Sequence, residues 1–149
     1  MKNLFQKETV DEILNRINKL TPATQRQWGK MNVDQMLAHC SVGLQTATGE
    51  KVLNFGFFLK MIGSLLKSQT TSPNPFPKNG PTHPAFKIEI TEGFEIEKVK
   101  LITLINQFNQ GGESKCTSNH HSFYGKLTPT QWSSLIYKHL NHHLTQFGV

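Results

Sequence analysis

The chain has 149 residues, enough for one domain with a sizeable core, and its Lys and Arg residues outnumber its Asp and Glu residues to give a formal net charge of +6. It contains no run of basic residues and no interleaving of basic with aromatic residues, so we expect no nucleic-acid partner. The N-terminus lacks the apolar stretch of a signal peptide, and the longest apolar segment, 52–66, contains Lys60 and is too short to cross a bilayer. We therefore expect a cytoplasmic protein without a membrane partner, and reduced thiols at Cys40 and Cys116.

A first helix is predicted near residues 9–20. Thr9 can cap its N-terminus, and Glu12 stands at the matching position of a capping box. Apolar residues then recur at helical spacing as far as Leu20, and the pair Thr21-Pro22 ends the pattern.

A second helix is predicted over residues 33–48. Asn32 and Gln35 have the spacing of a capping box, and Gly49 is well placed to end the helix. The apolar stripe includes Cys40, which we expect to be a small core residue. His39 lies beside this stripe and should face inward or nearly so.

An additional amphipathic helix is predicted near residues 54–67. Its apolar residues share one face: Phe55, Phe58, Leu59, Ile62, Leu65 and Leu66. We expect this face to pack against the other helices. The alternatives are a hydrophobic wall for a substrate or a homodimer contact.

Residues 68–93 form a long connection that contains five prolines, which exclude a regular helix. In a helix bundle such a segment can carry the chain from one end to the other. A third long helix is predicted over 94–110, ending at Gly111-Gly112, with apolar residues on two sides that favour burial of both. His83, His120 and His121 fall in irregular segments and are expected to be solvated.

The last helix is predicted over residues 129–146. Thr128 and Gln131 form a capping box, and Pro129 suits the first turn. At about 100° per residue, His139 and His143 point in the same direction as the apolar residues of the helix, whereas His142 lies at the rim.

Three inward histidines on two helices, His39, His139 and His143, indicate a metal site, because a catalytic site of the zinc type uses three protein ligands and keeps an open position. Imidazole also suits nickel, copper and iron. The competing interpretation is that these are core histidines satisfied by hydrogen bonds. A zinc-peptidase motif is excluded, since Leu140 stands where the catalytic Glu would be.

Residues 28–39, 123–132 and 139–143 resemble the DinB/YfiT-like superfamily, and more closely one of its bacterial branches of unknown function. The resemblance covers nearly the whole chain. It implies an all-α, up-down-down-up four-helix bundle with a long crossover and an additional short helix. It also implies a divalent metal ion, zinc or nickel, held by His39, His139 and His143.

Characterised relatives in that superfamily include transferases and isomerases that use small thiols such as bacillithiol or mycothiol. The resemblance therefore implies a thiol-dependent transferase acting on a small-molecule substrate. No motif in this chain carries over a thiol-binding residue. Two alternatives stay open: a metal-dependent hydrolase with His120 or His121 as proton shuttle, and a non-catalytic bundle that binds a hydrophobic ligand or partner through Phe55, Phe58 and Ile62.

Overall fold

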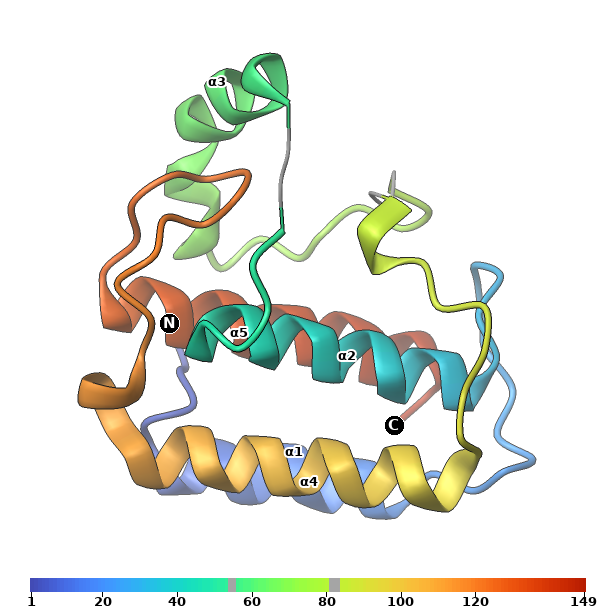
Figure 1. The fold of residues 1–149 in the computed structure, drawn as a ribbon. Coiled ribbons are helices and arrows are strands. Elements are labelled where there is room, and N and C mark those ends of the chain that lie inside the picture. Colours follow the sequence, from blue (N-terminus) through green and yellow to red (C-terminus); the bar gives the residue numbers. More distant parts are fainter. Residues whose placement is uncertain (54–55, 81–83) are drawn as a thin grey trace.

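The computed structural model describes residues 1–53, 56–80 and 84–149, and within these ranges the regular structure is helical throughout, as predicted (Figure 1). The five α-helices are α1 (Lys7–Asn18), α2 (Val33–Thr48), α3 (Phe57–Leu65), α4 (Phe94–Gly111) and α5 (Pro129–Gln146). Three short 3-10 helices complete the regular elements: η1 (Lys67–Thr70), η2 (Pro84–Phe86) and η3 (Gly112–Lys115). No helix in the described ranges combines the length and the apolar character needed to span a bilayer.

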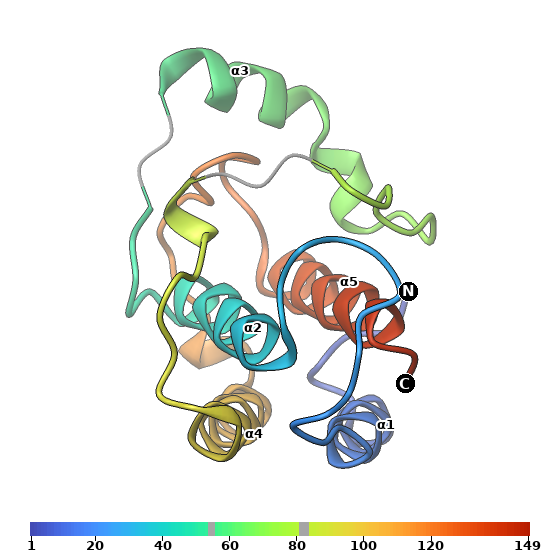
Figure 2. The ribbon, with the colours of Figure 1, turned by 90° about the vertical axis from the view of Figure 1, so that its right-hand side faces the viewer.

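The four long helices pack side by side, with α2 against α4 and α5, and α1 against the same two helices (Figure 2). Hydrogen bonds between helix ends define their directions. Asn109, near the end of α4, donates to the Leu4 carbonyl at 2.8 Å just before α1, so α1 and α4 run in opposite directions. Arg16, near the end of α1, donates to Asn141 near the end of α5 at 2.7 Å, so these two helices run in the same direction.

One cluster of apolar side chains fills the space between the long helices. Its largest fully buried members come from all four of them and from the segment before α1: Leu4, Ile13, Ile17, Met36, Leu37, Leu44, Leu101, Ile105, Phe108, Trp132, Leu140 and Leu144. The helical periodicity therefore identified the core-facing side of α1, α2 and α5, and one of the two sides predicted to be buried on α4.

The two helices that carry the three histidines begin where their caps predict. Asn32 and Gln35 exchange side-chain-to-backbone hydrogen bonds at the start of α2, and Thr128 and Gln131 do so at the start of α5. Gly49 ends α2 with φ of 83°, the left-handed conformation that glycine adopts without penalty. These caps satisfy helix-end groups and define the register in which the histidines are presented.

The prediction for α1 was wrong at its start. The helix begins at Lys7, two residues before the predicted cap, and Thr9 is buried within the first turns. The Thr9 hydroxyl donates to the side-chain oxygen of Gln6 at 3.2 Å instead of capping a helix end. Glu12 forms an ion pair with Lys2 rather than closing a capping box.

Segment 49–93 leaves the long helices, and its helix α3 stands above α2 and α5, on the side away from α1 and α4 (Figure 1). The predicted packing of the α3 face against the other helices is wrong, because Phe58 is 74% exposed and Leu65 is 81% exposed. Phe55 lies outside the described residues. The predicted burial of two sides of α4 is also wrong, since Ile96 and Val99 are exposed.

Candidate metal centre

His39, His139 and His143 lie together where α2 faces α5, as the sequence predicted. One ring nitrogen of each lies within 4.8 Å of the others. His39 comes from the middle of α2, and the other two come from successive turns of α5. His39 and His143 are only 5% and 8% exposed, and His139 is half-buried. The group contains three imidazoles and no carboxylate.

His39 is held by the backbone of the crossover. Its Nδ1 lies 2.9 Å from the carbonyl oxygen of Phe86 in η2, and a carbonyl oxygen can only accept, so Nδ1 carries the proton and donates it. The lone pair is therefore on Nε2, which points toward His139. A metal-binding histidine is oriented in the same way, by donating its other ring N–H to an oxygen.

His143 is held by a two-step chain of hydrogen bonds. Its Nδ1 donates to the side-chain oxygen of Gln146 at 2.8 Å, one turn further along α5. The amide nitrogen of Gln146 in turn donates to the carbonyl oxygen of Trp28 at 2.8 Å, which defines which end of the amide faces the histidine. His143 is therefore also the Nδ1–H tautomer, with its Nε2 lone pair free for a ligand.

His139 completes the group through its contact with His39. The two Nε2 atoms are 2.8 Å apart, so one of them carries a proton, and because the His39 proton is on Nδ1, the donor is His139. Its ring lies against the backbone of Gly43 on α2, where a Cβ atom would be only 3.0 Å from Nδ1. The glycine thus leaves room for the third imidazole.

Burial keeps these histidines neutral. It lowers the pKa of His39, lowers that of His143 to about 3, and together with the neighbouring histidines holds the pKa of His139 well below its ordinary value. Neutral imidazole is the form that binds a metal ion. His39 and His143 are oriented by fixed oxygens, and with His139 they fit a divalent ion provided that His139 moves its proton off Nε2 and the hydrogen bond between the two Nε2 atoms is broken.

Of the other histidines that the structure describes, none belongs to this group. His142 lies at the rim as predicted, half-buried and edge-on to the rings of Trp28 and Phe76. His120 is exposed on the loop before α5, and His83 lies outside the described residues.

His121 corrects the expectation of a solvated side chain. Its ring packs on Trp132 and Tyr124, each with ring centres 4.9 Å away. Its Nδ1 accepts hydrogen bonds from the backbone N–H groups of Phe123 and Tyr124, at 3.0 and 3.1 Å. Burial lowers its pKa to about 4. His121 therefore holds the loop in shape.

The two cysteines, unlike the three histidines, are not in the protonation state that binds a metal ion. Cys40 is buried, its thiol contacts the sulfur of Met36 at 3.8 Å, and burial raises its pKa far above the usual range. Burial also raises the pKa of Cys116 to about 11. Neither residue is a ready thiolate at neutral pH, as expected for Cys40.

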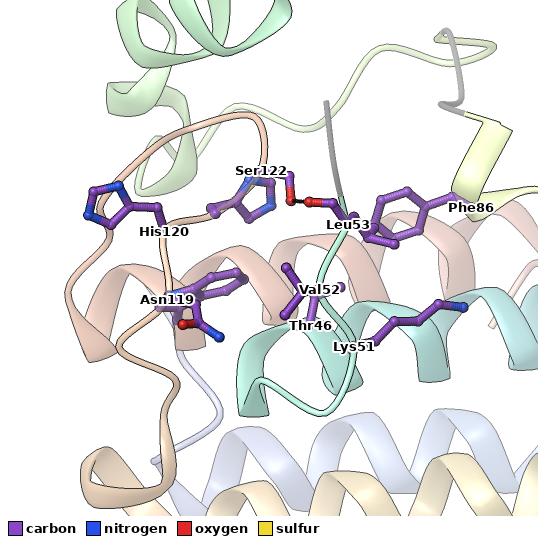
Figure 3. A pocket seen from close by; sticks show the side chains of 10 residues that line it. Thr46, Lys51, Val52, Leu53, Phe86, Asn119, His120 and Ser122 are labelled. Carbon is purple, nitrogen blue, oxygen red and sulfur yellow. Dashed lines mark hydrogen bonds between the residues drawn. The ribbon is translucent and has the colours of Figure 1, made fainter. Parts of the chain in front are cut away.

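A small cavity of about 20 Å³ lies beside the site, between α2, Phe86 and the loop that carries His121. Figure 3 shows Phe86 and His120 at opposite ends of the lining, with the Ser122 hydroxyl bonded to the Leu53 carbonyl between them. A space of this size holds about one water molecule. Phe86 thus contributes its ring to the cavity and its carbonyl oxygen to His39.

Sequence reasoning missed three partners of the ligands: Phe86, Gln146 and Gly43. Gln146 had a signal, since it follows His143 by three residues on one helix face and could reach it. Gly43, four residues after His39 on the same helix, was a weaker signal of close approach. The Phe86 carbonyl had none, because it is a backbone atom in an irregular segment.

Comparison with known proteins gives one match. No curated protein and no solved structure matched the chain. A family model described as "Protein of unknown function (DUF1569)" matches residues 2–148, nearly the full length. The chain therefore belongs to the DUF1569 family of proteins of unknown function.

Proposed function

We propose that this chain is a divalent-metal-dependent enzyme with the DinB-like up-down-down-up bundle, and that His39, His139 and His143 hold zinc or nickel. The observation that carries the proposal is the convergence of three imidazoles, two of which donate Nδ1–H to fixed oxygens. One nitrogen of each ring lies within 4.8 Å of the others, a spacing that a single ion could bridge in place of the hydrogen bond between His39 and His139. The opposed directions of α1 and α4, and the common direction of α1 and α5, support the topology.

The reaction that we propose is the transfer of a small thiol to an electrophilic small molecule. A divalent ion among three neutral ligands keeps its full charge and lowers the pKa of a coordinated thiol. The protein's own part is to orient the imidazoles and to limit water, because His39 and His143 are buried. The ring of Phe86, 5.6 Å from that of His39, adds an apolar wall suited to an uncharged electrophile.

Hydrolysis is less well supported. The proton shuttle considered for it, His121, has its Nδ1 occupied by two backbone N–H groups and its ring packed on Trp132. Such a ring cannot swing between the site and solvent without breaking the loop. His120 is exposed at the end of the cavity away from Phe86 (Figure 3).

The test is to load the protein with zinc or nickel and to screen electrophiles with and without small thiols. We expect turnover that requires both the ion and a thiol and is lost in His143→Ala. His120→Ala is the matched control, since it removes an exposed histidine. Turnover that needs the ion but ignores thiol would replace transfer by hydrolysis, and an unaltered metal content in His143→Ala would remove that residue from the ligand set.

A further inference from the structure

The positive charge of this chain is concentrated in one segment. Residues 51–88 contain five lysines and no acidic residue, so this quarter of the chain carries five of its six net positive charges. The lysines are Lys51, Lys60, Lys67, Lys78 and Lys87. The ion pairs found among the described residues all involve α1, and none involves a lysine of this segment. Lys78 lies over the ring of Trp28, 4.4 Å from its centre, but no acidic side chain among the described residues neutralises the charge of the segment.

The same segment carries the exposed apolar face of α3. Phe58, Met61, Ile62 and Leu65 follow the i, i+3, i+4, i+7 pattern that places them on one side of a helix, and all four are exposed. The buried Gly63 lies on another side of α3 and contacts the backbone of Phe123, where a side chain would overlap the carbonyl oxygen. The helix thus attaches to the protein by one side and presents its apolar side outward.

We infer that α3 and the lysine-rich segment that carries it form a docking surface for the anionic phospholipids of a bilayer. A helix with an apolar outward face and flanking cations lies in the plane of a membrane interface, with the apolar side chains among the acyl chains and the cations at the headgroups. Lys67 directly follows α3, a position from which lysine reaches headgroups. Lys51 lies further away, beside α2 (Figure 3). α3 also projects from the molecule on the side away from α1 and α4 (Figure 1).

Charge complementarity favours an anionic bilayer over a second copy of the chain as the partner of this surface. Two copies that met through α3 would bring two such lysine-rich segments together, with no acidic residue in either to pair with them. An anionic bilayer supplies the opposite charge over a wide area and accepts apolar side chains. The absence of a membrane partner, expected from the sequence, rested on the lack of a spanning segment, and surface binding needs none.

The test is co-sedimentation with vesicles of phosphatidylcholine alone or mixed with phosphatidylserine. We expect binding to the anionic vesicles that weakens with added salt. Leu65→Asp should reduce the bound fraction by roughly tenfold, since it places a charge in the inserted face. Val99→Asp is the matched control, because Val99 is an exposed apolar residue on α4, and it should bind as the wild type does.

Several outcomes would overturn the inference. They are no binding to anionic vesicles, equal binding to both kinds of vesicle, and an effect of Val99→Asp as large as that of Leu65→Asp. A wild-type dimer in light scattering that Leu65→Asp dissociates would instead assign the face to a second copy. His39→Ala should bind vesicles normally, so that a failure here is separate from a failure of the proposed metal site. Circular dichroism confirms that each variant is folded.

Discussion

The contact between α2 and α5, here called the seam, differs in construction from the segment 51–88. The seam joins two long helices with complete capping boxes, and its side chains are largely buried. The described part of the segment contains the nine-residue helix α3 and the short helices η1 and η2, and much of its apolar surface is exposed. Yet the segment supplies the Phe86 oxygen that orients His39. The seam provides the ligands, whereas a loosely packed segment determines the tautomer of one of them.

The largest effect is expected when one of the three histidines between α2 and α5 is removed. His39→Ala should weaken binding of zinc or nickel by more than about 100-fold. Removing a residue that binds the ion costs more than removing a residue that only orients such a ligand. His120→Ala should bind the ion with wild-type affinity. Equilibrium dialysis with elemental analysis measures both, and a His39→Ala protein with unchanged affinity would contradict the site.

The next test leaves all three ligands and removes a support. Gln146→Leu keeps the approximate volume of the side chain but loses the hydrogen bonds to His143 and to the Trp28 carbonyl. We expect a loss of metal affinity of about 10- to 100-fold. The control is Gln25→Leu in the exposed linker before α2. Equal affinities in the two variants would show that the chain of hydrogen bonds does not orient His143.

Acid should destabilise the metal-free protein through its neutral histidines. Unfolding lets His121 return from a pKa of about 4 toward its usual 6.5, so the unfolded state binds more protons and stability falls as pH drops through that window. From pH 7 to pH 5 this one histidine should cost about 2 kcal/mol. His121→Asn keeps an acceptor for the loop but cannot titrate in this range, and urea unfolding at both pH values should show a smaller loss.

The exposed histidine gives a control for that measurement. His120→Asn should lose as much stability between pH 7 and pH 5 as the wild type does. If His121→Asn and the wild type lost equal stability, the buried state of the His121 ring would be contradicted. A metal chelator keeps the three ligands in the same state in every sample.

The smallest effect on the stability of the core is expected from disrupting the contact that attaches α3 to the loop before α5. Gly63→Ala would drive a methyl group into the Phe123 carbonyl, so α3 should separate from the loop. We expect faster tryptic cleavage within residues 51–70, with the free energy of unfolding of the long helices changed by less than about 0.5 kcal/mol. A large loss of stability would show that α3 supports the core after all.

The two regions also differ in how well sequence predicts them. The starts of α2 and α5 followed from capping boxes that the structure contains, and the core faces followed from apolar periodicity. The start of α1 was missed because Gln6 caps it without a side-chain hydrogen bond, so the stronger capping residue Thr9 misled the prediction. For α3, periodicity identified which side is apolar, but it contains no information on what covers that side.

The candidate metal site was likewise predictable where it lies on regular helices and unpredictable where it lies on irregular segments. Helical geometry placed His139 and His143 on one face, and the apolar stripe of α2 placed His39, because all three belong to regular elements. The Phe86 carbonyl and the packed ring of His121 depend on how irregular segments fold back, which no local pattern encodes. The metal, the thiol and the reaction stay predictions.

The hydrogen bonds of Gln146 have a consequence for the exchange of backbone amides with solvent. The carbonyl of Gln146 accepts from the amide of Gln27 at 2.8 Å, and its side chain holds the neighbouring Trp28 carbonyl and the His143 ring. An ion that binds His143 stabilises the closed state of this whole connection. Deuterium uptake at Gln27, a residue of the linker between α1 and α2, therefore reports whether the site is filled.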